Sequence, residues 1–202
     1  FIINLMTISE IDRLAIHGGE PSFKKELPTF NSIGDEEVKA VNEVMLSGEL
    51  SGYYGSWSPE FYGGKKVKQL EEEWSTKFKC NYSIAVNSNT SGLLAAMGAI
   101  GLKPGDEVIL PPLSMSATAI APLFYGGVPV FCDVEPVTCT LDPEKIEKHI
   151  TKRTKAIIVV NLFGHIAYLS KLREIANKYN LFLIEDNAQA PLGHEVGNLA
   201  GT

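Results

Sequence analysis

The sequence is poor in the features that mark several protein classes. It has three cysteines in 202 residues, Cys80, Cys132 and Cys139, and no CxxC pair. This odd and scattered set argues against a disulfide framework and against a structural zinc site. The four histidines show no metal-ligand spacing either, so we expect no metal. The formal net charge of −6 gives a nucleic-acid-binding role no electrostatic support.

Long hydrophobic runs are also missing. The longest apolar stretches are far shorter than a membrane span, and no basic region precedes an apolar stretch at the N-terminus, as a secretory signal would require. We therefore expect a cytoplasmic protein with no membrane segment. The composition, 45% hydrophobic and 21% charged, is that of an ordinary globular protein with one well-buried core.

Three common site motifs are absent as well. There is no GxGxxG after the first expected strand, which removes the fingerprint of a dinucleotide-binding fold. There is no GxxxxGK[ST] phosphate loop and no GxSxG nucleophile elbow.

The most informative stretch that is present covers residues 181–191, LFLIEDNAQAP. Four apolar residues predict a short buried strand, and a polar cluster containing Asp186 and Gln189 follows it. In open α/β sheets, ligands bind at the carboxyl ends of the strands. Asp186 is therefore a candidate site residue, although an Asp after a strand more commonly caps a turn.

Strands and helices alternate along the chain with short loops. We expect strands at residues 83–86, 107–110, 128–132, 155–160 and 181–184, and helices at residues 36–45, 67–78, 93–100, 114–125, 143–150 and 168–179. This alternation is typical of βαβ units around a mainly parallel sheet. Right-handed crossovers place every carboxyl end on one edge, so we expect residues 89–91, 111–115, 161 and 186–189 to converge there.

A polar turn at residues 87–92 leads from the first expected strand into a helix. Free N–H groups at a helix N-terminus attract anions, and the hydroxyls of Thr90 and Ser91 add donors. An ordinary N-cap would explain the same residues. Together with the carboxylate of Asp186, however, the turn suits a ligand that has a phosphate at one end and a basic ring nitrogen at the other. Pyridoxal phosphate is such a ligand.

The loop at residues 48–64 is rich in glycine and aromatic residues, among them Tyr53 and Tyr54. We interpret it as a substrate-contact or subunit-contact loop. The alternative is local packing of the rings against the core.

Several motifs in order and spacing resemble the DegT/DnrJ/EryC1/StrS family of nucleotide-sugar aminotransferases, which are fold-type-I pyridoxal-phosphate enzymes. The segments that carry the resemblance are LSGELSG (46–52), AVNSNTSGL (85–93), KPGDEVILPP (103–112), GGVPVFCDVEP (126–136), NLFGH (161–165) and IEDNAQAPLGHEVGNLAGT (184–202). The resemblance implies a three-layer α/β fold, with a mainly parallel sheet and helices on both faces. It also implies a homodimer with active sites at the subunit interface.

The resemblance assigns cofactor-binding roles to individual residues. It implies that Asn89, Thr90 and Ser91 form the turn that holds the phosphate, that Asp186 pairs with the pyridine nitrogen, and that Gln189 contacts the ring hydroxyl. Tyr53 and Tyr54 lie where the family builds part of its substrate site.

Two of the residues at this expected site depart from the family pattern. Met115 stands where an aromatic ring usually stacks on the cofactor, and its thioether can still pack on a ring face. Asn89 stands in a motif that usually reads Ser-Gly-Thr.

The resemblance implies a pyridoxal-phosphate-dependent aminotransferase of a nucleotide-linked keto sugar, with glutamate as the expected amino donor. We expect an N-terminal irregular arm at residues 1–34 and an incomplete large domain at residues 35–202. The family's Schiff-base lysine lies downstream of Thr202, so we expect this chain to be a fragment truncated at its C-terminus, inactive by itself and without catalytic residues of its own. One alternative is a sugar dehydratase of the same family, which carries histidine in place of the lysine. Another is a non-catalytic binding module.

Overall fold

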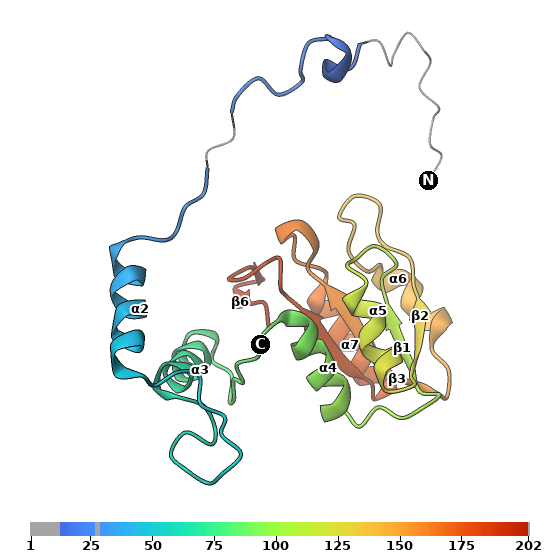
Figure 1. Cartoon of the computed structure of the whole chain (residues 1–202). Helices are drawn as coiled ribbons and strands as arrows, with labels where there is room; N and C mark the ends of the chain where they lie inside the picture. Colours follow the sequence, from blue (N-terminus) through green and yellow to red (C-terminus); the bar gives the residue numbers. More distant parts are fainter. Residues whose placement is uncertain (1–12, 27–28, 202) are drawn as a thin grey trace. The chain divides into compact units, whose positions relative to one another are not determined.

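The computed structural model describes residues 13–26 and 29–201 (Figure 1). The chain divides into two units, Phe1–Leu50 and Ser51–Thr202. Residues 1–12 and 27–28 of the predicted N-terminal arm lie outside the described residues. The described part of the arm contains one short 3-10 helix, η1 (Ala15–His17). The domain boundary that we expect after residue 34 stays a prediction.

Helix α2 (Asp35–Ser47) belongs to the first unit and confirms the helix predicted at residues 36–45. Its start is fixed by Glu37, whose Oε2 accepts the N–H of Gly34 at 2.7 Å. This hydrogen bond stabilises the charged carboxylate and lowers the pKa of Glu37. The helix ends at Gly48, which takes a left-handed φ of 71°.

The second unit contains the remaining elements. Its helices are α3 (Lys65–Phe78), α4 (Asn89–Ala99), α5 (Ala117–Phe124), α6 (Pro143–Ile146), η2 (Glu147–His149), η3 (Leu162–Gly164) and α7 (Leu169–Tyr179). Its strands are β1 (Glu107–Leu110), β2 (Val128–Phe131), β3 (Thr154–Val160), β4 (Phe182–Asp186), β5 (His194–Glu195) and β6 (Asn198–Leu199).

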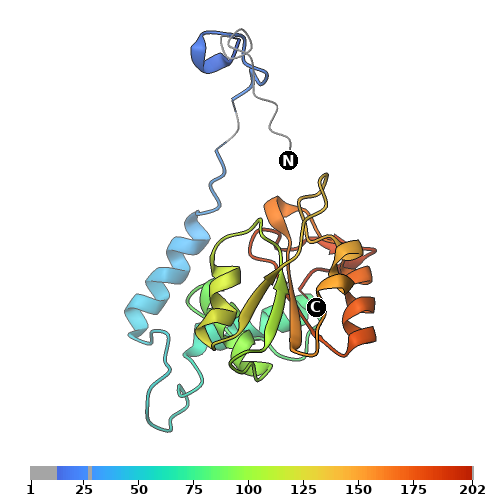
Figure 2. The same cartoon turned by 90° about the vertical axis from the view of Figure 1, so that its right-hand side faces the viewer.

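Four of these strands form a parallel sheet in the order β2-β1-β3-β4. Short strands β5 and β6 pair separately as an antiparallel hairpin. Figure 2 shows the parallel sheet between α5, in olive, and α7, in orange-red. The three-layer fold class is therefore confirmed.

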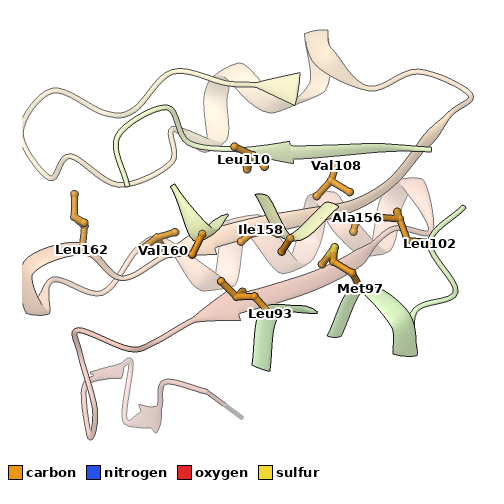
Figure 3. Close-up of a cluster of buried hydrophobic side chains, with 11 residues drawn as sticks. Leu93, Met97, Leu102, Val108, Leu110, Ala156, Ile158, Val160 and Leu162 are labelled. Carbon is orange, nitrogen blue, oxygen red and sulfur yellow. The ribbon is translucent and has the colours of Figure 1, made fainter. Parts of the chain in front are cut away.

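The two faces of the sheet carry two separate cores because side chains alternate along each strand. On one face Val108 and Ile158 pack against Leu93 and Met97 of α4 (Figure 3). On the other face Ile157 joins a cluster with residues of α6 and α7. Each fully buried aliphatic side chain of this kind stabilises the fold by about 1.5–3 kcal/mol.

The structure corrects one predicted strand. Residues 83–86 form no strand within the described part of the chain, and the N–H of Ala85 donates to Glu71 Oε1 at 2.7 Å. Ile84 is 80% exposed, so its apolar character does not place it in the core. The prediction was wrong because an apolar run becomes a strand only when another strand pairs with it.

Several predicted boundaries also move, and three of these shifts concern the carboxyl edge of the sheet. Helix α4 begins at Asn89 instead of Leu93, which places the polar turn residues in its first turn. Helix α5 begins at Ala117, three residues later than predicted. Strand β4 extends to Asp186, so this carboxylate belongs to the strand itself.

Candidate cofactor site

The candidate site lies at the carboxyl ends of β3 and β4. Parallel pairing sets Val160 opposite Asp186, and the next residue of the chain, Asn161, donates its backbone N–H to the carbonyl of Asp186 at 3.0 Å. The expected convergence of residues 161 and 186–189 at one sheet edge is therefore present.

Asp186 is the buried carboxylate of this edge, with 7% of its surface exposed. Its Oδ1 accepts two hydrogen bonds, one from Asn89 Nδ2 at 2.9 Å and one from the backbone N–H of Ala188 at 3.2 Å. Its Oδ2 has no hydrogen-bond donor among the described residues. One carboxylate oxygen is thus fixed, and the other is left to accept a hydrogen bond from a ligand.

Asn161 holds the two residues that flank Asp186. Its Nδ2 donates to Glu185 Oε1 at 2.6 Å and to Asn187 Oδ1 at 3.0 Å, and its Oδ1 accepts the N–H of Ala167 at 2.9 Å. These hydrogen bonds place the side chains of Glu185 and Asn187 on the same face of the sheet as that of Asn161. Because side chains alternate along a strand, the side chain of Asp186 points to the opposite face, toward α4. The sequence placed Asn161 at the edge but did not reveal that its side chain links three segments.

The N-terminus of α4 lies beside Asp186, as the bond from Asn89 requires. Ser88 is the N-cap, and its Oγ accepts the N–H of Ser91 at 3.2 Å. The Ser91 hydroxyl donates to Asn87 Oδ1 at 2.6 Å. The N–H groups of Asn89 and Thr90 have no acceptor among the described residues, as expected in the first turn of a helix. The N-cap is therefore present, and because it leaves these two N–H groups available, the anion site stays a prediction that the cap does not oppose.

Gln189 follows β4, and its side chain contacts the loop after β3. Its Oε1 accepts the N–H of Phe163 at 2.7 Å. Phe163 has a left-handed φ of 57°, which is uncommon for a residue with a side chain. This contact orients the amide of Gln189 so that its NH2 group remains as a donor. Nothing in the sequence indicated this hydrogen bond, because nothing there distinguishes Phe163 from an ordinary loop residue.

The structure does not join the other candidate residues to Asp186. Met115 lies between β1 and α5 at the same edge of the sheet, and 69% of its surface is exposed. Tyr53 and Tyr54 are about half exposed in the loop before α3. Burial, followed by the charge of Glu71, raises the pKa of Tyr53.

The same loop is closed at its base by two backbone hydrogen bonds, from Tyr53 N–H to Glu60 O at 2.9 Å and from Gly64 N–H to Ser51 O at 2.7 Å. Its rings pack on one another, since Trp57 stacks on Phe61 with centroids 4.2 Å apart. Trp57 is nevertheless 80% exposed. Local packing of the rings is therefore present in this loop, and its role as a contact loop stays a prediction.

An open cavity of about 460 Å³ adjoins the site. Its lining includes Asn89, Asn187 and Ala188 at the site and Trp74 of α3. Within the described residues, no group of His, Cys, Asp and Glu side chains could hold a metal ion. None of the helices described here is both long and apolar enough to cross a membrane.

A parallel α/β sheet with a buried carboxylate at its carboxyl edge, next to a helix N-terminus with open N–H groups, is an arrangement with which α/β proteins commonly bind ligands. Comparison with protein families then identifies the group. Residues 31–202 match the DegT/DnrJ/EryC1/StrS aminotransferase family, and the chain belongs to this family. The resemblance seen in the sequence is confirmed.

Two curated relatives and one solved structure illustrate the similarity. An L-glutamine:2-deoxy-scyllo-inosose aminotransferase of Streptomyces kanamyceticus is 36% identical, with 92% of this chain and 43% of the relative covered. A 3-oxo-glucose-6-phosphate:glutamate aminotransferase of Bacillus subtilis (strain 168) is 39% identical over 81% of this chain and 35% of the relative. A GDP-4-keto-6-deoxymannose-3-dehydratase with a trapped PLP-glutamate geminal diamine superposes with a TM-score of 0.77 at 28% identity, covering 88% of this chain and 45% of that one. The chain therefore spans less than half the length of the relatives it matches.

Proposed function

We propose that the protein to which this chain belongs is a pyridoxal-phosphate-dependent aminotransferase that acts on the keto group of a nucleotide-linked sugar. The proposal depends above all on Asp186, a buried carboxylate with one oxygen free, in a chain of this aminotransferase family. The named substrates of the two relatives, an inosose and an oxo-glucose phosphate, support a polyhydroxylated ring ketone. Their named donors, glutamine and glutamate, support an amino-acid donor, and we propose glutamate.

The residues present suit pyridoxal phosphate. Oδ2 of Asp186 offers a charged acceptor to a protonated ring nitrogen, because Oδ1 already has its two donors. The open N–H groups of Asn89 and Thr90, with the hydroxyl of Thr90, offer donors to a phosphate. The NH2 group of Gln189 offers a donor to the ring oxygen. When bound, the cofactor supplies an electron sink for the substrate carbon that loses a proton.

The lysine that the family uses is proposed to come from outside this chain. The described lysines of α7 are engaged elsewhere, since Lys171 Nζ donates to Glu144 Oε1 at 3.2 Å and Lys178 Nζ donates to Glu147 Oε1 at 2.9 Å. Both pairs lie on the α6 and α7 side of the sheet, whereas Asp186 is directed toward α4. Neither lysine is a candidate for the covalent role.

The test is to supply the complete encoded protein with pyridoxal phosphate, glutamate and a panel of keto sugars. The panel should include a nucleotide-linked sugar, a sugar phosphate and a free cyclitol ketone. The expected result is formation of 2-oxoglutarate together with an amino sugar, fastest with the nucleotide-linked member. Asp186→Asn should lower the rate by at least about a hundredfold, because removing one preorganised charged partner of a reacting group costs on that order. An unchanged rate in this variant would contradict the role of Asp186.

A second candidate is a sugar dehydratase of the same family, favoured by the structural match to GDP-4-keto-6-deoxymannose-3-dehydratase. Mass spectrometry of the product separates the two, because an aminotransferase adds nitrogen to the sugar and a dehydratase removes a ring hydroxyl. A protein that binds cofactor and sugar without any turnover would instead support the non-catalytic binding module.

We further propose that the protein is a cytoplasmic homodimer. Light scattering coupled to size-exclusion chromatography would test the dimer, and a monomer at micromolar concentration would contradict it. Cell fractionation would test the compartment.

A further inference from the structure

Asn89 stands at the first position of α4, yet its side chain does not serve the helix. Its Nδ2 reaches across to Asp186 Oδ1 at 2.9 Å, a contact between residues 97 positions apart in the chain. The N-cap role is already filled by Ser88, whose Oγ accepts the N–H of Ser91. The side chain of Asn89 therefore does not cap the helix, and its hydrogen bond is to the carboxylate of Asp186.

The carboxylate needs this partner because it is buried. Only 7% of Asp186 is exposed, and a buried charge is costly unless hydrogen bonds satisfy it. The two donors on Oδ1, Asn89 Nδ2 and Ala188 N–H, come from different elements, one from the start of α4 and one from the turn after β4. They fix the rotation of the carboxylate group, since a single bond would leave it free to turn.

From these contacts we infer that Asn89 is a positioning residue for Asp186. It engages Oδ1, so that Oδ2 is the oxygen presented to the ring nitrogen of the cofactor, and it does so through its side-chain amide. The inference rests on the proposed function, and it changes the role expected for Asn89. The backbone N–H of Asn89 remains open to the phosphate, but its side chain acts on the other end of the ligand.

The inference has a structural consequence for the site. The phosphate-binding end and the ring-binding end are joined by one hydrogen bond between α4 and β4. A shift of the helix N-terminus would therefore turn the carboxylate. A glycine at position 89 would not provide this link, because it has no side chain.

The experiment compares two probes on the complete encoded protein. The first is 4-deoxypyridoxine 5′-phosphate, which has the ring nitrogen and the phosphate but no aldehyde and so cannot react with any lysine. The second is inorganic phosphate, which reports on the anion site alone. Dissociation constants are measured by calorimetry for the wild type, for Asn89→Ala, for Asp186→Ala and for the double variant. Asn177→Ala is the matched control, because Asn177 is exposed on α7 at the other face of the sheet.

Asn89→Ala should weaken the ring probe about tenfold, the usual effect of losing one hydrogen bond to a charged group. It should change the affinity for inorganic phosphate by less than about twofold, because the backbone N–H groups remain. In the Asp186→Ala background the same replacement should change ring-probe affinity by less than about twofold, since residues that act through one another are not additive. Asn177→Ala should bind both probes like the wild type.

Three results would overturn the inference. Equal weakening of both probes by Asn89→Ala would place its side chain at the phosphate. Unchanged ring-probe affinity in Asn89→Ala would mean that the carboxylate needs no positioning. Full additivity with Asp186→Ala would mean that the two residues act separately.

Failure of the proposed cofactor site would look different, because the wild type itself would then not bind the ring probe. A dehydratase would bind it, and mass spectrometry of the product identifies that case. If Asn89→Ala does not fold, Asn89→Ser replaces it, because serine is accepted at a helix start but its hydroxyl is one atom too short to reach Asp186. Urea unfolding without any probe provides an independent readout. The double variant should lower the unfolding midpoint by less than the sum of the single variants, and exact additivity would contradict the bond itself.

Discussion

Asn161→Ala should strongly destabilise the protein. Asn161 has no exposed surface, and its side chain makes three hydrogen bonds. They join the end of β3 to Glu185 and Asn187 on one side and to Ala167 on the other. Alanine removes all three bonds and leaves their partners in place.

The magnitude follows from what each partner loses. The N–H of Ala167 is buried, since this residue is 1% exposed, and a buried N–H without a partner costs about 1–3 kcal/mol. Glu185 keeps a second donor, the N–H of Gly201 at 2.7 Å, so its loss is smaller, about 1 kcal/mol. Asn187 is half-buried and can exchange its bond for water. The sum is a loss of about 3 kcal/mol, which lowers the melting temperature by about 6–12 °C for a protein of this size.

Urea unfolding followed by circular dichroism would measure this loss. Asn177→Ala is again the matched control, because Asn177 is exposed and its side chain makes no hydrogen bond among the described residues. The control should change the free energy of unfolding by less than about 0.5 kcal/mol. A loss below about 1 kcal/mol for Asn161→Ala would refute the view that this side chain holds the edge together.

Three further changes test other parts of the structure. The Thr151 hydroxyl donates to Glu107 Oε2 at 2.5 Å and lowers the pKa of Glu107, so the charged carboxylate stabilises the fold at pH values above its unfolded pKa of about 4.3. Glu107→Gln should therefore unfold at a lower urea concentration than the wild type at pH 7, and this difference should shrink as the pH falls below about 4.3 and through the lowered pKa of the folded state. Burial raises the pKa of Cys132 to about 11, so only about one Cys132 thiol in a thousand is ionised at pH 8. A thiol reagent should therefore leave Cys132 unlabelled until the protein unfolds, as measured by mass spectrometry. Gly52 has a φ of 73°, and a Cβ at this position would lie 2.5 Å from the backbone nitrogen of Gly64. Gly52→Ala should lower the free energy of unfolding by about 2 kcal/mol and speed proteolysis of the loop at residues 48–64. An unchanged cleavage rate would contradict this.

The sequence predicted the central strands well because their pattern is local. Residues 107–110 are apolar after one acid and are bounded by Gly-Asp and Pro-Pro, and they form β1 with the predicted ends. Residues 83–86 carry a similar apolar pattern but do not form a strand. Pairing with another strand is a non-local property that a short window cannot contain, which is why the same reasoning succeeded at one segment and failed at the other.

The candidate site was predicted in the same uneven way. Asp186 and Asn161 were placed at one edge because parallel strands end together, and this needs only the order of elements. The hydrogen bond from Asn89 to Asp186 depends on how closely α4 approaches β4, which no spacing in the sequence encodes. The one available signal was a side chain at position 89, where the family motif usually has glycine.

Strand β4 explains why a carboxylate can be both buried and available. Its last residue, Asp186, is directed toward α4, while its neighbours Glu185 and Asn187 are held on the opposite face by Asn161. The two faces of β4 thus have different roles. The side chains on the face toward Asn161 anchor the strand, and the side chain of Asp186 on the face toward α4 is available to a ligand. Because alternate residues of a strand face opposite ways, a change of one residue in the register of β4 would exchange these roles and place the carboxylate in the anchoring layer. The pairing of β4 with β3 over five residues is therefore as necessary to the site as Asp186 itself.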